Sequence, residues 1–96
     1  MRAEKLTSTI AGWKIARQSV APSGAALVEF EHGAQMVLAS PAPPTFPVGK
    51  KIHGAKQTGS SLHLEFEDGS IVPVPLAGPT SSVQVEDENG KVVYRD

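Results

Sequence analysis

The sequence feature that most constrains the fold is an alternating segment centred on Asp68-Gly69. Before this dipeptide, apolar residues such as Leu62 and Leu64 alternate with polar ones, and a run rich in Val and Pro follows it. Asp-Gly favours a two-residue type I′ turn, because Asp tolerates positive φ and Gly adopts it without steric cost. Residues 61–76 are therefore predicted to form a β-hairpin.

A two-residue turn would set the register of this hairpin and its core face. Directly opposed residues share one side of a sheet, and the sides alternate along each strand. The predicted core face comprises Leu62, Leu64, Phe66, Ile71, Pro73 and Pro75. The opposite face would carry Val72 and Val74, and we expect another strand, a loop or a second subunit to cover it.

The two prolines indicate where the second strand of this hairpin lies in its sheet. Proline has no N–H to donate, so in sheets it occurs at edges, bulges or strand starts. In the predicted register, Pro73 and Pro75 fall at non-hydrogen-bonded positions, and their missing donors would point away from the hairpin. Residues 72–76 are therefore predicted to form an edge strand, or a strand that is paired only weakly on its far side.

Alternation and turn signals predict further short strands on both sides of this hairpin. They cover residues 5–10, 13–20, 25–31, 34–39, 50–56, 83–87 and 91–95. For residues 3–12 a helix is the alternative, because Leu6 and Ile10 are four positions apart. In the last hairpin, Asn89-Gly90 sets a register that directs four apolar side chains inward, those of Val83, Val85, Val92 and Tyr94.

Residues 14–41 resemble residues 51–79 and predict an internal repeat. In particular, residues 28–34 read Val-Glu-Phe-Glu-His-Gly-Ala and residues 64–70 read Leu-Glu-Phe-Glu-Asp-Gly-Ser. Each copy would be a three-stranded meander that cannot bury its apolar face alone. We therefore expect a single all-β domain over residues 1–96, built from two meanders and a C-terminal hairpin. It would be a small barrel or two-sheet sandwich of about eight or nine short antiparallel strands.

Composition favours a small cytoplasmic protein without disulfides. The chain has 96 residues, a formal net charge of −1 and no cysteine. No apolar run approaches the roughly 20 residues of a membrane-spanning helix, so we expect no membrane association. The net charge gives the whole chain no overall nucleic-acid signature, so any polyanion site would have to be local.

No catalytic motif is present in the sequence. A Cys nucleophile is absent, and no serine occurs in a Gly-x-Ser-x-Gly pattern. The absence of these motifs favours a protein without enzymatic activity, and no cofactor is predicted. A His-x-Glu pair on a strand can supply two metal ligands, which makes His63 and Glu65, with His53 as a third ligand, the weak candidates for a metal site.

The leading functional hypothesis is a non-enzymatic interaction or assembly module that binds a protein partner or forms a homodimer. Its candidate contact residues lie in a Pro-rich crossover, residues 40–49, and on the mixed face of the hairpin: Pro44, Phe46, Pro47, Val72 and Val74. A less favoured alternative is a small barrel that binds nucleic acid or another polyanion through Lys14, Arg17, Lys50, Lys51 and Lys56. A third is a metal- or small-ligand-binding protein with a cleft between the two halves.

Overall fold

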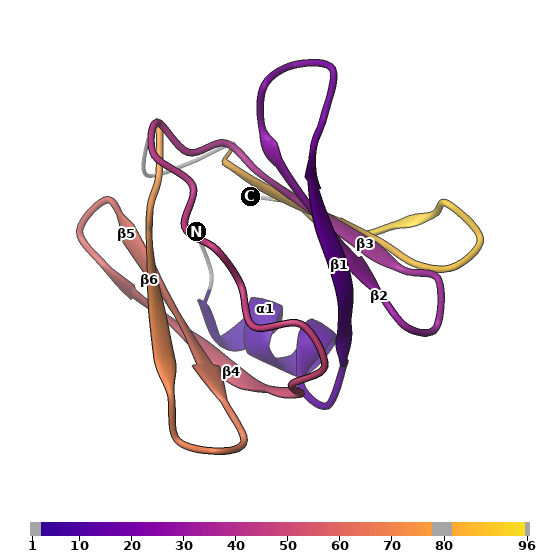
Figure 1. Ribbon diagram of the computed structural model, residues 1–96, viewed down its shortest axis with the longest axis horizontal. Helices are drawn as coiled ribbons and strands as arrows, with labels where there is room; N and C mark the ends of the chain where they lie inside the picture. The colour runs from indigo at the N-terminus through magenta and orange to yellow at the C-terminus, as the bar shows by residue number, and fades with distance from the viewer. Residues whose placement is uncertain (1–2, 78–81, 96) are drawn as a thin grey trace.

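The computed structural model describes residues 3–77 and 82–95. These residues form one helix and eight strands: α1 (Ala3–Ile10), β1 (Ile15–Val20), β2 (Ala26–Phe30), β3 (Gln35–Leu38), β4 (Ile52–Thr58), β5 (Ser61–Phe66), β6 (Ile71–Pro75), β7 (Val83–Glu86) and β8 (Val92–Arg95). One antiparallel sheet has the order β1-β2-β3-β7-β8 and the other has the order β4-β5-β6 (Figure 1). The fold is mostly β, as predicted, but the sheets do not close, so the barrel alternative is wrong.

The hairpin around Asp68-Gly69 has a three-residue loop instead of the predicted two-residue turn. The N–H of Phe66 donates to the carbonyl of Ser70 at 2.9 Å, and the N–H of Gly69 donates to the carbonyl of Phe66 at 2.9 Å. Gly69 has a φ of +89°. This is the geometry of a type I turn followed by a left-handed residue. The same pair of backbone bonds closes the loops within residues 21–25, 30–34 and 87–91.

The longer loop shifts the hairpin register by one residue. Leu62 pairs with Val74, and Leu64 pairs with Val72. Because a one-residue shift moves a strand's side chains to the opposite face, Val74 is buried whereas Ile71 is 55% exposed. The predicted core face is therefore right for β5 and wrong for β6. In the last hairpin the same kind of loop pairs Val92 with Glu86 and leaves it outside the core. An irregularity between Val85 and Glu86 then restores the predicted pair of Val85 with Tyr94, and the other three predicted inward residues are buried.

The prediction that residues 72–76 form a sheet edge is confirmed. β6 is the last strand in the order β4-β5-β6. The N–H of Leu76 donates to the carbonyl of Ser60 at 2.8 Å. Since hydrogen-bonded pairs alternate along an antiparallel ladder, Pro73 and Pro75 lie at the positions whose donors would face outward. The outer edge of β6 therefore lacks two N–H groups.

The segment near the N-terminus is a helix, so the strand predicted for residues 5–10 is wrong and the helical alternative is right. Leu6 and Ile10 lie one turn apart and are both buried. The hydroxyl of Thr7 donates to the carbonyl of Ala55 at 3.1 Å and accepts the N–H of Ala55 at 2.9 Å. Both Ala55 groups lie on the side of β4 that faces away from β5. Through Thr7, the helix thus provides the hydrogen-bond partner for the edge of β4 that a further strand would have supplied.

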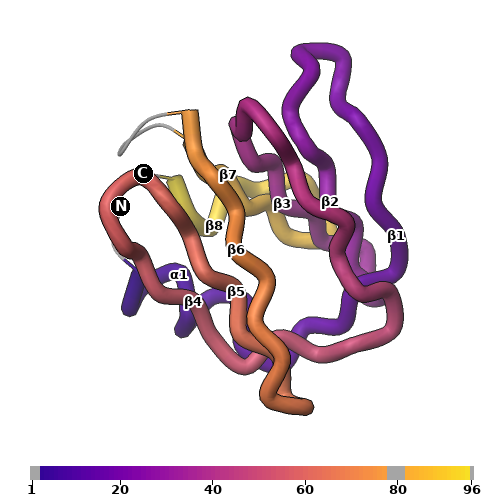
Figure 2. Tube along the Cα trace, turned by 60° about the vertical axis from the view of Figure 1, so that its left-hand side comes forward, coloured from indigo at the N-terminus to yellow at the C-terminus, as the bar shows by residue number. Residues whose placement is uncertain are grey.

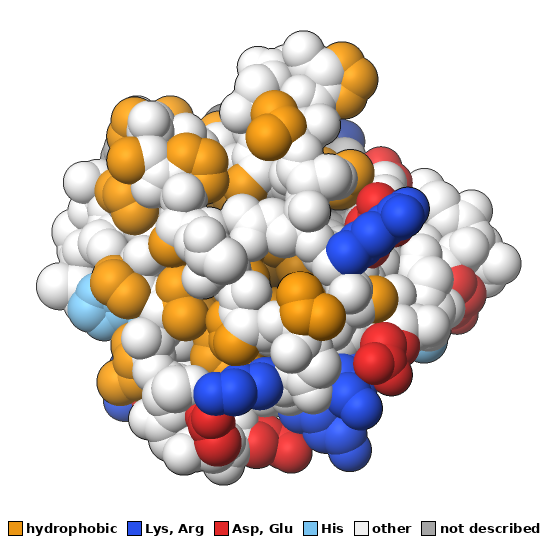
Figure 3. All heavy atoms as spheres, viewed as in Figure 1, with side chains coloured by type: hydrophobic (Ala, Val, Ile, Leu, Met, Phe, Trp, Pro, Cys, Tyr) orange, Lys and Arg blue, Asp and Glu red, His pale blue; other side chains and the backbone are white. Residues whose placement is uncertain are grey.

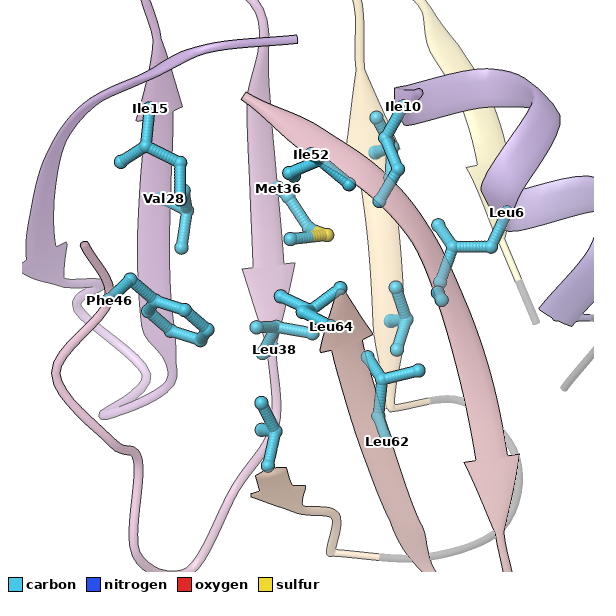
Figure 4. Close-up of a cluster of buried hydrophobic side chains, with 14 of the residues drawn as sticks. Leu6, Ile10, Ile15, Val28, Met36, Leu38, Phe46, Ile52, Leu62 and Leu64 are labelled. Atoms are coloured by element: carbon cyan, nitrogen blue, oxygen red, sulfur yellow. The ribbon is translucent and has the colours of Figure 1, made fainter. Parts of the chain in front are cut away.

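The core fills the space between the sheets and receives side chains from both of them (Figure 4). The Pro-rich crossover connects β3 to β4 and runs along the side where β1 and β6 face each other (Figures 1 and 2). At its end, the N–H of Gly49 donates to the carbonyl of Ile15 at 2.8 Å, and Ile15 donates to Lys50 at 3.2 Å. These bonds fix the crossover to the start of β1.

Replacing Thr7 with Val should destabilise the fold by about 1–3 kcal/mol, because the shape is kept while the Ala55 donor and acceptor lose their partner. Thr9→Val is the matched control. The Thr9 hydroxyl bonds only the carbonyl of Lys5 within the exposed part of the helix, and its loss should cost less than about 0.5 kcal/mol. Urea unfolding measures both values. Equal losses for the two variants would contradict this role of Thr7.

Candidate interaction surface

The contact residues predicted from the sequence are mostly inside the molecule. Phe46 is 2% exposed and packs beside Val28 (Figure 4), so it is not the anchor of an exposed arm. Val74 is fully buried and Val72 packs against the core, because the register shift turns both inward. Pro44 and Pro47 are half-buried. On the outer face of β6, the exposed residues Ile71, Pro73 and Pro75 therefore take the place of the predicted valines.

The basic residues of the predicted polyanion strip are largely paired with acids. The pairs are Lys14 with Glu31 (3.7 Å), Arg17 with Glu29 (2.8 Å), Lys50 with Asp68, and Lys56 with Glu65 (3.7 Å). Lys51 is exposed and, among the described residues, has no acidic partner. The strip is thus a mixed surface of alternating charge.

The candidate metal ligands do not form a site. Among the described residues there is no group of three His, Cys, Asp or Glu side chains suited to a metal ion. Glu65 is engaged with Lys56, and His63 lies opposite Lys56 and Pro73 in the sheet. His53 lies at an irregularity in the β4–β5 ladder and is exposed. The arrangement does not hold the three side chains as a ligand set.

A groove of about 440 Å³ runs along the free edge of β1. One wall consists of four consecutive residues of β1, and the other consists of crossover residues: Arg17, Gln18, Ser19, Val20, Thr45, Phe46 and Val48. Side chains alternate between the faces of a strand. Consecutive residues can line one groove only if it follows the edge of the strand. The groove therefore has the position that an added strand would occupy.

The side chain of Gln18 holds the crossover beside β1. Its amide nitrogen donates to the carbonyl of Pro44 at 2.8 Å, and its amide oxygen accepts the N–H of Phe46 at 2.8 Å. A side-chain amide has the same donor and acceptor as a peptide group. Gln18 can thus bind the crossover without using its own backbone.

The backbone of β1 keeps free hydrogen-bonding groups on this edge. The N–H of Ala21 donates to Ala25 at 2.8 Å, and alternation then directs Ser19 toward Leu27 on β2. The N–H and C=O groups of Gln18 and Val20 consequently point away from β2, into the groove. No hydrogen bond between described residues reaches them.

Two large apolar side chains are exposed on opposite walls of the groove. Val20 is 73% exposed and Val48 is 61% exposed. Val20 lies on the core-facing side of β1, opposite the buried Ala26, but the β1–β2 hairpin projects beyond the rest of the molecule (Figures 1 and 2). In the view of Figure 3, hydrophobic side chains are exposed on this projecting hairpin. Sequence reasoning missed both valines, and only the absence of charge from residues 18–20 signalled an accessible edge.

A second depression, of about 360 Å³, lies at the end of the five-stranded sheet. It is lined by Ser23, Ala25, Val37, Ala39, Ser82, Val83, Gln84 and Arg95. Arg95 donates to the side-chain oxygen of Gln84 at 3.3 Å, and Gln84 donates to Glu86 at 3.2 Å. These polar groups therefore bind one another. The depression does not lie in the predicted cleft between the halves, where hydrophobic side chains of both sheets pack together.

Comparisons with protein-family models, with curated proteins and with solved structures give no significant match to this chain. None of the described helical residues belongs to a segment with the length and apolarity needed to cross a membrane.

Gln18→Met should release the crossover from β1. The substitution preserves the volume but leaves the Pro44 carbonyl and the Phe46 N–H unpaired, which should cost about 1–3 kcal/mol. Hydrogen exchange at the Phe46 amide should become faster than in the wild type. Gln57→Met is the control, because Gln57 bonds only the Gly59 carbonyl in an exposed turn. An unchanged Phe46 exchange rate would contradict the proposed clamp.

The ion pair between Lys50 and Asp68 should make stability depend on acid pH. The Lys50 ammonium, followed by the hydroxyl and N–H of Ser70, holds the pKa of Asp68 well below its usual range. The unfolded chain therefore takes up a proton near the ordinary value of about 3.9 while the folded chain does not, so this stabilisation is lost as pH falls below that value.

Asp68→Asn and Lys50→Gln should each flatten the acid part of the stability profile. Urea midpoints measured from about pH 2 to pH 6 report this slope, since it reflects the difference in bound protons between the two states. A slope in either variant as steep as that of the wild type would show that the pair does not set the acid sensitivity.

Proposed function

We propose that this protein is a non-enzymatic interaction or assembly module whose contact surface is the groove along β1. The observation that carries the proposal is the exposure of Val20 and Val48 on the two walls of this groove. Between them lie the free backbone groups of Gln18 and Val20. A sheet edge beside an apolar groove suits an added strand, whose main chain supplies hydrogen bonds and whose side chains occupy the groove.

The other sheet edges support this choice of surface. Exposed strand edges can pair with other chains, and proteins usually block or cover them. On β6, Pro73 and Pro75 remove two outward donors, and on β4 the Thr7 hydroxyl binds both outward groups of Ala55. β8 contacts α1. By contrast, β1 contains no proline and has two successive open positions at Gln18 and Val20, whereas β4 is open only at Gln57 near its end among the described residues.

The competing functions have weaker support. Four of the five predicted polyanion contacts are engaged with carboxylates, which opposes binding to phosphate groups. The three candidate metal ligands do not converge on one point. In the depression near Arg95, the side chains of Arg95 and Gln84 already bind each other. None of these features matches the unpaired backbone and exposed valines beside β1.

We also infer that the domain is a two-sheet sandwich that contains an internal repeat. The two meanders β1-β2-β3 and β4-β5-β6 have irregularities at equivalent places, after Ile15 and after Ile52. Equivalent bonds join Glu31 to the carbonyl of Lys14 at 2.9 Å and Glu67 to that of Lys51 at 3.0 Å. Lys14 and Lys51 themselves form a bridge. These correspondences support a duplicated unit.

A photo-reactive amino acid placed at position 20 or 48 should form covalent adducts with polypeptide in cells that express the protein, because both positions lie on the groove. The same residue at position 71 is the matched control, since Ile71 is an exposed apolar residue on the proline-blocked strand β6. Intact mass spectrometry detects the adducts. Absence of adducts at both 20 and 48, or equal adducts at 71, would refute the proposed surface.

A further inference from the structure

We infer that the occupant of the β1 groove is a second copy of this chain, which adds its own β1 antiparallel to the first. This inference rests on the proposed function and names the partner. The two five-stranded sheets would join at β1 around a two-fold axis. Such an interface uses the same surface on both subunits and closes on itself, as most homodimers do.

The free backbone groups define the register of this pairing. Hydrogen-bonded pairs in an antiparallel ladder must join residues whose N–H and C=O both point to the shared edge. In β1 these residues are Gln18 and Val20, as the bonding of β2 shows. A symmetric register that satisfies them sets Gln18 of each copy opposite Val20 of the other copy. Ser19 then lies on the axis, opposite Ser19 of the second copy.

The same register buries the exposed valines. A two-fold axis perpendicular to the joined sheet keeps the core-facing sides of both β1 strands on the same side. Val20 lies on that side, and so does the crossover held by Gln18. Val20 of each copy would therefore pack on the Phe46 and Val48 wall of the other copy. Removal of apolar area from water favours this contact.

No like charges oppose each other in this arrangement. Arg17 is the only charged residue of β1, and the register sets it opposite Ala21 of the second copy. Its guanidinium is already bound to Glu29 on the same chain at 2.8 Å. Like charges placed directly opposite in a sheet would be destabilising. The pairing therefore brings together uncharged residues with free backbone groups.

The proposed interface between the two β1 strands is small, and its size sets the expected affinity of the dimer. An interface confined to one strand edge and one groove wall is smaller than the roughly 1,600 Å² of a standard stable interface. We therefore expect a reversible dimer whose population depends on concentration. Sedimentation equilibrium of the purified chain from about 10 μM to about 1 mM covers the range in which such dimers form.

Val20→Pro tests the pairing by removing a donor that faces the partner. The N–H of residue 20 does not bond to β2, so the substitution preserves the β1–β2 ladder, as Pro73 and Pro75 do on β6. Val20→Lys is a second variant that places charge on the same edge. Each should raise the dimer dissociation constant by about tenfold or more. Ile71→Lys, the matched loss of an exposed apolar residue elsewhere, should leave the constant unchanged.

Cysteine substitution tests the register directly, because the chain contains no cysteine of its own. Opposed residues at a non-hydrogen-bonded position have Cα atoms about 4.5 Å apart, within the range of about 4.4–6.8 Å that a disulfide needs. Ser19→Cys treated with oxidised glutathione should therefore form a covalent dimer. Ser23→Cys, an exposed serine that the register sets far from its equivalent, should form much less.

The inference is overturned if the wild type is monomeric at the highest concentration, if Val20→Pro and Val20→Lys dimerise as well as the wild type, or if Ile71→Lys weakens the dimer equally. It is also overturned if Ser23→Cys crosslinks as readily as Ser19→Cys. Circular dichroism verifies that each variant is folded. A monomer that still gives adducts from positions 20 and 48 with a different chain refutes self-pairing and retains the proposed function. A monomer that gives no adducts from positions 20 and 48 refutes both self-pairing and the proposed function.

Discussion

Unpaired backbone groups at strand edges are the constraint on which the rest of this structure depends. Every buried N–H and C=O needs a partner, and two short open sheets leave edges on both sides of the core. On β4, the hydroxyl of Thr7 meets this need, and this contact fixes α1 against the sheet. On β6, Pro73 and Pro75 remove the donors instead. On β1, the crossover pairs by backbone only near Ile15 and is then held by the Gln18 side chain.

Alternation in the sequence identified most of the strands, whereas their register depended on turn chemistry that the sequence left open. Asp68-Gly69 fits a two-residue type I′ turn and also a three-residue loop that ends in a left-handed glycine. The choice moves every side chain of β6 to the other face. The observed loop buries Val74 and packs the half-buried Val72 against the core on the side of Leu62 and Leu64, and it leaves the prolines outside. Burial of valines instead of two prolines is consistent with this outcome, but local patterning does not reveal it.

The sequence singled out the crossover segment that lines the groove, but it did not show which side chains are exposed there. The crossover stood out through its prolines and Phe46, but Phe46 faces the core of its own chain. Similarly, Leu6 and Ile10 have helical spacing, yet alternation predicts a strand there and the Thr-Ser-Thr run and Gly12 disfavour a helix. The exposure of Val20 depends on how far the β1–β2 hairpin extends beyond the second sheet (Figure 2). That is a tertiary property, which no local pattern contains.

The proline content of the crossover links its structural role to the proposed interaction. A crossover with a full set of N–H groups could continue the pairing that begins at Ile15 and close the edge of β1. Pro44 and Pro47 have no N–H to donate and favour backbone conformations that disrupt a regular ladder. Gln18 supplies two hydrogen bonds to this segment from its side chain, so the crossover stays in place while the backbone of Gln18 and Val20 stays free. The composition that prevents a sixth strand within the chain is therefore what leaves the position open to a strand from outside.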